Sequence, residues 1–286
     1  MKLRFNSIII AGAMTAIASW QSGAAETVAV SEVAHIHGIA VDTVDPARLY
    51  LATHFGVFRT SPNGTAERIS DNNNDYMGFS PHPSELNVFF ASGHPANGGN
   101  MGIIVSRDGA QSWQQLAGGV DGPVDFHAMD VSPADPNVIF GLYGMVQVTR
   151  DGGMTWTVAG SPPADVYDIA ASAVDPDIVY AATRSGVMVS LDGGRTWNPS
   201  GGKGQTASMV ETSADGKVYA FVLGSGLVST SATTLAWKTV ANNFGELVLL
   251  HLAVDASNPD RMFAVTGESK ILTSTDGGKN WAAFGS

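Results

Sequence analysis

The sequence predicts an all-β protein folded as a six-bladed β-propeller, and three observations lead to this fold class. An eight-residue segment recurs as Ser106–Trp113, Thr149–Trp156, Ser190–Trp197 and Ser274–Trp281. The closing tryptophans of these segments, together with Trp237, lie 43, 41, 40 and 44 residues apart, and a period of ~40 residues is typical of repeat architectures. The 33 glycines and 13 prolines, with only 14% charged residues, indicate many turns and few helices.

Each repeat divides into four short strands. The first repeat has an alternating run at His35–Asp42, a turn at Val44–Pro46, an apolar strand at Leu49–Thr53 and a glycine-led strand at Gly56–Arg59. Six such units begin near residues 35, 75, 126, 167, 207 and 249. Four strands in each of six units predict six blades, and seven blades fit less well because no seventh unit remains. We expect Thr27–Ser31 to complete the last blade.

The recurring segment has the composition of a β-hairpin. An Asp side chain accepts hydrogen bonds from backbone N–H groups two or three residues on, glycine supplies positive φ, and the Trp fills the wedge between neighbouring units. We therefore assign structural roles to four aspartates: Asp108, Asp151, Asp192 and Asp276. Two degenerate copies lie at Ser229–Trp237, without the Asp, and at Thr60–Gly64, without the Trp.

The pattern S-x-D-x-G-x-T-W resembles the BNR or Asp-box repeat of sialidase-type and sortilin-type propellers. His35–Asp42 and Ala52–Phe58 also look like segments of small exported bacterial propellers that are labelled glycosyl hydrolases or sialidase-like proteins. This resemblance covers nearly all of the expected mature chain. It implies a carbohydrate-active or carbohydrate-binding protein. Photosystem assembly factors share the repeat, and they imply a third class, a protein-binding scaffold.

Residues 1–25 have the features of a secretory signal peptide. Lys2 and Arg4 precede an apolar run at Ile8–Ala18, and Gly23–Ala25 resembles a cleavage site. The expected mature protein is a single propeller domain over residues 26–286, periplasmic or secreted by a bacterium. With no cysteine the chain has no disulfide, and no later segment is suited to membrane insertion.

The formal charge of −11 becomes −13 when Lys2 and Arg4 are removed. This acidity argues against nucleic acid as a partner. No phosphate-binding or nucleotide motif is present, so we expect no nucleotide or organic cofactor. A metal ion, a small polar ligand and a protein partner all stay open.

The propeller topology predicts that six of the seven histidines share one end of the central channel. The first strand of each blade starts at the face where the second strand ends, so His82 alone falls on the far face. Imidazole is a common ligand of zinc and copper. We therefore expect a copper or zinc site, with ligands drawn from His35, His37, His54, His94 and His127.

Further residues near that face could ligate the ion or orient the imidazole rings. They are Asp75, Asp125, Asp168, His251 and Met101. The alternative interpretation of the histidines is a solvated channel mouth, or a glycan site without metal.

The arginines argue against a true sialidase, in which three arginines hold the substrate carboxylate. Arg184 is the one arginine that the predicted topology brings to the histidine face. Five further arginines fall in or beside turns of the opposite face: Arg48, Arg59, Arg107, Arg150 and Arg261. The sequence thus favours metal binding, with carbohydrate binding or hydrolysis as the alternative and a protein-binding scaffold as a third possibility.

Overall fold

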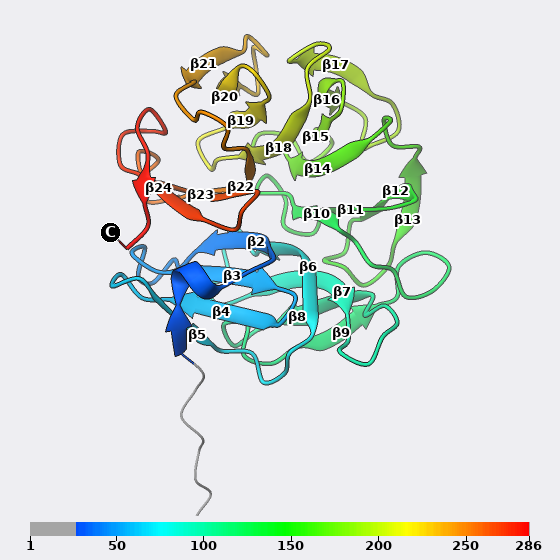
Figure 1. Cartoon of the computed structure of the whole chain (residues 1–286). Coiled ribbons are helices and arrows are strands. Elements are labelled where there is room, and N and C mark those ends of the chain that lie inside the picture. Colours follow the sequence, from blue (N-terminus) through cyan, green and yellow to red (C-terminus); the bar gives the residue numbers. More distant parts are fainter. Residues whose placement is uncertain (1–26, 286) are drawn as a thin grey trace, which may run out of the picture.

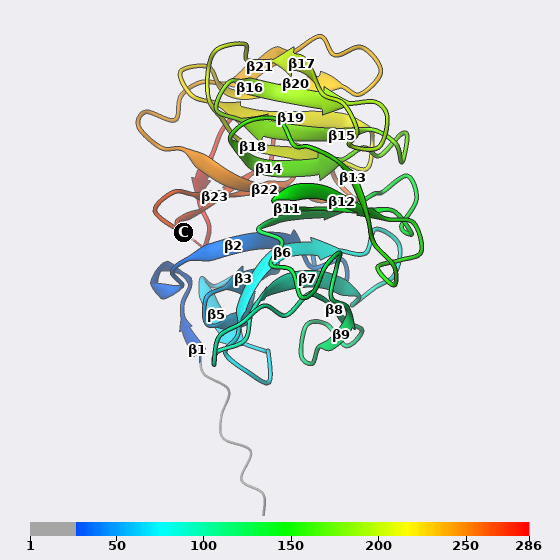
Figure 2. The ribbon, with the colours of Figure 1, turned by 90° about the vertical axis from the view of Figure 1, so that its right-hand side faces the viewer.

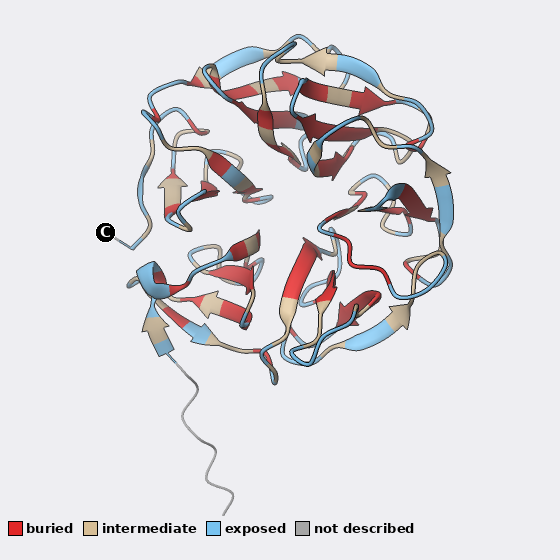
Figure 3. Ribbon diagram, turned by 45° about the vertical axis from the view of Figure 1, so that its right-hand side comes forward, coloured by how far each residue is buried: buried red, intermediate tan, exposed pale blue. Residues whose placement is uncertain are grey.

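Six sheets follow one another along the chain in the computed structural model, which describes residues 27–285. The sheets are arranged radially around a central channel, which confirms the predicted six-bladed propeller (Figures 1 and 3). The expected signal peptide lies outside the described residues. Among residues 27–285, no helix has the length and apolar character needed to cross a membrane.

Each blade is one continuous piece of chain, with its first strand at the channel and its last strand at the rim. Blades 1 to 3 consist of β2 (Ile36–Val41), β3 (Leu49–Thr53), β4 (Gly56–Thr60), β5 (Thr65–Arg68); β6 (Asp75–Pro81), β7 (Phe89–His94), β8 (Ile103–Ser106), β9 (Gln114–Ala117); and β10 (Ala128–Val131), β11 (Ile139–Tyr143), β12 (Met145–Thr149), β13 (Thr157–Gly160). Blades 4 to 6 consist of β14 (Val166–Ala171), β15 (Val179–Thr183), β16 (Gly186–Ser190), β17 (Asn198–Gly201); β18 (Ala207–Thr212), β19 (Lys217–Val222), β20 (Gly226–Ser231), β21 (Lys238–Ala241); and β22 (Leu249–Val254), β23 (Met262–Thr266), β24 (Ile271–Ser274), β25 (Ala282–Ala283).

The ring closes differently from our expectation. β1 (Thr27–Ala29) pairs with β5 and adds a fifth strand to the rim of blade 1. The prediction that Thr27–Ser31 completes the last blade is therefore wrong, because β25 occupies the edge of β24. A 3-10 turn, η1 (Val30–Glu32), leads from β1 toward β2. No strand is exchanged between the first and last blades in the described chain.

The hydrophobic core consists of six wedges, one between each pair of neighbouring blades. The wedge between blades 6 and 1 joins Ile36 and Phe58 to Phe263 and Val265. Hairpin tryptophans enter the other wedges: Trp156, for example, packs on Phe126 with ring centroids 5.1 Å apart. Burial of these faces holds the blades together, since each sheet buries both faces against its neighbours.

The recurring segments form the turns between the third and fourth strands. In blade 4, Ser190 Oγ accepts a hydrogen bond from Gly194 N at 2.8 Å, and Asp192 Oδ1 accepts one from Thr196 N at 2.9 Å. Hydrogen bonds from the Thr196 hydroxyl, from the Thr196 N–H and from the Ser190 hydroxyl lower the pKa of Asp192 to about 2. In blade 5, Thr230 occupies the place of Ser190 and Ala232 that of Asp192, so the degenerate copy starts one residue later than the sequence indicated.

Candidate metal centre

A β-bulge turns one residue of the first strand of blade 1 toward the mouth of the channel. The pairing of β2 with β3 passes from Ile36↔Thr53 to Gly38↔Ala52, which leaves His37 as the extra residue. Bulges of this kind re-aim a side chain and are frequent beside functional sites. His37 consequently lines the channel, whose cavity has a volume of about 360 Å³.

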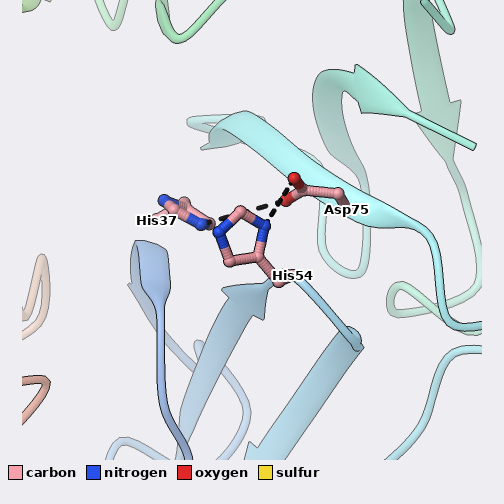
Figure 4. A group of neighbouring side chains, drawn as sticks. All are labelled: His37, His54 and Asp75. Carbon is pink, nitrogen blue, oxygen red and sulfur yellow. Dashed lines mark hydrogen bonds and ion pairs between the residues drawn. The ribbon is translucent and has the colours of Figure 1, made fainter. Parts of the chain in front are cut away.

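His37, His54 and Asp75 form the first His–Asp group (Figure 4). His54 Nδ1 lies 2.5 Å from Asp75 Oδ2, and His37 Nε2 lies 3.9 Å from Asp75 Oδ1. The rings of His37 and His54 meet edge to face, with centroids 4.3 Å apart. One possible ligand atom from each residue lies within 4.8 Å of the other two, which brings together side chains from blades 1 and 2.

A tight turn between β3 and β4 positions His54. The buried Thr53 hydroxyl donates to Gly56 O at 2.8 Å and accepts from Phe55 N at 3.0 Å. Gly56 has a φ of 108°, and a Cβ there would lie 2.5 Å from Ser70 Oγ. Only glycine suits this backbone, so the turn has one shape and holds the imidazole over the channel mouth.

Two atoms of the first group are buried without a hydrogen-bond partner among the described residues, His37 Nε2 and Asp75 Oδ1. Buried polar atoms are nearly always paired, so this nitrogen and this oxygen are both available to bind a ligand. Burial, assisted by the nearby His54, lowers the pKa of His37 to about 4. The ring is therefore neutral at physiological pH, the state in which imidazole binds metal.

His94, Asp125 and His127 form the second His–Asp group, between blades 2 and 3. Asp125 Oδ2 lies 2.8 Å from His94 Nε2 and 2.6 Å from His127 Nε2. His94 Nδ1 lies 2.7 Å from Gly99 O. The hydrogen bond to Asp125 raises the pKa of His127. The five histidines that we expected to share one site are thus distributed between two groups, with His35 outside both.

His35 approaches the first group without belonging to it. Its ring centroid lies 4.9 Å from that of His54. Its backbone has a φ of 54° and its N–H donates to Ser269 Oγ of blade 6 at 3.1 Å. The left-handed backbone is the reason that His35 and His37 do not extend side by side from one strand, as alternation alone would suggest.

Three further residues of the expected set lie apart from both groups. Asp168 accepts hydrogen bonds from Val210 N of blade 5, at 3.0 Å, and from Ile169 N. His251 hydrogen-bonds the backbone of Ile36, and burial followed by the charge of His37 lowers its pKa to about 4. Met101 accepts from Asn74 Nδ2 at 3.6 Å and packs in the wedge between blades 1 and 2.

Sequence reasoning missed two carboxyl groups of the channel wall, Asp130 and Glu211, which lie with Asp168. Asp130 accepts from Ser80 Oγ of blade 2 and from Ala171 N of blade 4, both at 2.8 Å. Burial raises the pKa of Asp130 to about 6, that of Asp168 to about 8 and that of Glu211 well above its usual range. The signal available was a charged residue inside an otherwise apolar first strand, Met129-Asp130-Val131 or Val210-Glu211-Thr212. These carboxyl groups pair with backbone donors that the innermost strands leave free.

No family model matches the sequence. The chain is 23% identical over 292 aligned positions to the oligoxyloglucan-reducing end-specific xyloglucanase of Emericella nidulans, covering 85% of this chain and 33% of the relative. A GH74 enzyme of Niastella koreensis superposes with a TM-score of 0.60 at 17% identity, over 87% of this chain and 45% of that enzyme. YCF48, solved with a D1 peptide bound, superposes with a TM-score of 0.56 at 17% identity, over 92% of this chain and 85% of that one.

These likenesses relate the fold to glycoside hydrolase propellers of the GH74 type. The chain spans about a third of the length of the curated xyloglucanase and less than half of the GH74 enzyme. At such identities the comparisons define the class of fold, and the chemistry has to be inferred from the residues of the site.

Proposed function

We propose that the protein binds a divalent transition-metal ion, copper or zinc, through His37, His54 and Asp75 at one mouth of its channel. The observation that supports this most is the facing pair of buried, unpaired atoms, His37 Nε2 and Asp75 Oδ1. Metal–nitrogen and metal–oxygen bonds are each about 2.0–2.2 Å long. The distance of 3.9 Å between His37 Nε2 and Asp75 Oδ1 is thus close to the largest that one ion can bridge.

The donor set also narrows the choice of ion. Two imidazoles and a carboxylate suit zinc(II) and copper(II), whereas copper(I) prefers sulfur ligands. Met101 accepts a hydrogen bond from Asn74 and lies outside the group, so this thioether does not accompany the imidazoles. Three protein ligands leave at least one coordination position for water or a small ligand. The expected export from the cytoplasm would expose this site to the metal ions of the periplasm or the medium.

Calorimetric titration of the tag-free protein with zinc(II) and copper(II) tests the proposal. We expect His54→Ala to abolish the tight site and Asp75→Asn to weaken it about 10- to 100-fold. Metal at 100 times Kd should stabilise the wild-type fold by about 2.7 kcal/mol. His82→Asn is the matched control, because it removes a histidine from the opposite face and keeps an acceptor for the N–H groups of Ser84 and Glu85.

Unchanged affinity in both site variants would overturn the assignment of these ligands. Absence of any heat of binding and of any shift in melting temperature with either metal would overturn metal binding itself.

A carbohydrate-binding function is the second candidate, supported by the likeness to a xyloglucanase and by exposed aromatic rings. Phe55, beside His54, is 59% exposed, and Tyr167, which lines the channel, is 52% exposed. Aromatic faces of this kind can stack on the apolar face of a sugar ring. A glycan array that includes xyloglucan oligosaccharides would detect such binding. Loss of a positive signal in Phe55→Ala and Tyr167→Ala would assign it to this mouth, whereas an array without signal would contradict this second candidate.

A further inference from the structure

We infer that the second His–Asp group, His94, Asp125 and His127, holds a second transition-metal ion, so that the channel mouth binds two. This inference rests on the proposed function in one respect: it gives the second group the same chemistry as the first. The observations that support it are separate, because they concern other residues.

The contact of His94 Nδ1 with Gly99 O leaves His94 Nε2 as the ring nitrogen that can bind a metal ion beside Asp125. Gly99 O can only accept a hydrogen bond, so His94 Nδ1, 2.7 Å away, carries a proton. In a neutral ring His94 Nε2 then presents a lone pair to Asp125 Oδ2, 2.8 Å away. A metal ion placed beside these two atoms would bind both. A hydrogen bond from one ring nitrogen to a backbone carbonyl is also the usual support of a metal-binding histidine.

Asp125 supplies the second observation. Its side chain is only 6% exposed, and its Oδ1 has no hydrogen-bond partner among the described residues. Its other oxygen already faces both His94 and His127. A buried carboxylate oxygen without a donor is costly in a metal-free protein. A metal ion bound by the carboxylate could satisfy it, since one carboxylate oxygen of Asp125 and one nitrogen of each imidazole lie within 4.8 Å of one another.

The two groups are immediate neighbours. Asp75 of the first group and His94 of the second are direct partners in the pairing of β6 with β7, and such partners have side chains about 5 Å apart at Cβ. Two divalent ions so close together repel each other, so the second ion to enter should bind more weakly than the first.

Native mass spectrometry and metal analysis of zinc-loaded protein test this inference. We expect two ions per chain in the wild type, one in His127→Ala, one in His54→Ala, and none in the double variant. The His127 side chain is 64% exposed, so its removal should leave the fold intact, and a circular dichroism spectrum checks this. His82→Asn should retain two ions. Loaded with copper(II), the wild type should show dipolar broadening of its electron paramagnetic resonance signal that either single variant lacks.

The outcomes separate the two assignments. One ion in the wild type, lost in His54→Ala and retained in His127→Ala, would overturn the second site and leave the proposed function standing. One ion retained in His54→Ala and lost in His127→Ala would support the second site and overturn the first.

Discussion

His251 shows how a single residue can couple ring closure to pH. Its ring lies between blades 6 and 1 and hydrogen-bonds the backbone of Ile36. Its pKa is about 4 in the folded protein, because burial and the nearby His37 disfavour the charged ring, whereas an unfolded histidine has a pKa of 6.5. Between these two values the unfolded chain binds more protons than the folded one. Stability is therefore lost as the pH falls from 6.5 toward 4.

Replacement of His251 by Gln should remove this pH dependence. The amide can still donate to Ile36 and does not titrate. We expect the wild type to lose about 2 kcal/mol through His251 when the pH is lowered from 7 to 5, and the variant to avoid that loss. Urea unfolding at the two pH values measures the difference. An equal loss of stability in both proteins would show that His251 does not titrate as described.

For single residues, the sequence predicts which side chains lie at the channel mouth better than it predicts which residues they contact. The histidines of one channel mouth could be found by counting along the strands. Their separation into two groups could not, because it depends on the bulge at His37 and on the positive φ of His35. The hydrogen bond from Val210 N to Asp168 could not be predicted either, because it depends on which blade faces the carboxylate.

Two turns of the same shape connect the second and third strands of blades 1 and 4. The Thr183 hydroxyl donates a hydrogen bond to Gly186 O and accepts one from Ser185 N. The Thr53 hydroxyl makes the same two hydrogen bonds, with Gly56 O and Phe55 N. Gly186 has a φ of 122° and Gly56 one of 108°. The turn in blade 1 carries His54, whereas the turn in blade 4 carries Arg184 at the same position.

This correspondence provides an experiment with an internal control. Gly56→Ala and Gly186→Ala should each cost about 1–3 kcal/mol, because both place a Cβ in a left-handed backbone and against neighbouring atoms. Only Gly56→Ala should also weaken metal binding, by about tenfold or more, because the turn orients His54. Thermal unfolding and calorimetry provide the two readouts. Equal metal affinities in the two variants would show that the turn does not position the ligand.

Strands and hairpins were the most predictable elements, because the information for each lies within a few residues. The turn at Asp192 is specified by its own serine, aspartate and glycines. β1 was misplaced because its partner depends on which sheet edge is free. The short β25 pairs with β24, and β1 pairs instead with the edge of β5.

The ring of blades closes where blade 6 meets blade 1, a contact that we call the seam. No strand of the described chain is exchanged across it. The wedge between blades 6 and 1 is supplemented by Phe284, whose ring centroid lies 5.8 Å from that of Phe263. The N–H of His35 donates to Ser269 across the same seam. Side-chain packing therefore replaces the backbone hydrogen bonds that an exchanged strand would supply.

Phe284→Ala should weaken this seam. For a half-buried phenylalanine we expect a loss of about 2 kcal/mol and a melting temperature lower by roughly 5 °C. The control is Leu191→Ala, which removes an apolar side chain that is 58% exposed in a hairpin. A similar fall in the melting temperature of both variants would contradict a special role for Phe284.

The continuity of each blade also has a consequence for the order in which the chain folds. A blade that is complete in sequence can form as it emerges, without waiting for distant residues. Both His–Asp groups lie within residues 37–127, so three nascent blades already contain every proposed ligand. The seam waits for Phe284, which follows the last strand of blade 6. The sequence therefore supplies all the proposed metal ligands before it supplies the residue that closes the circle.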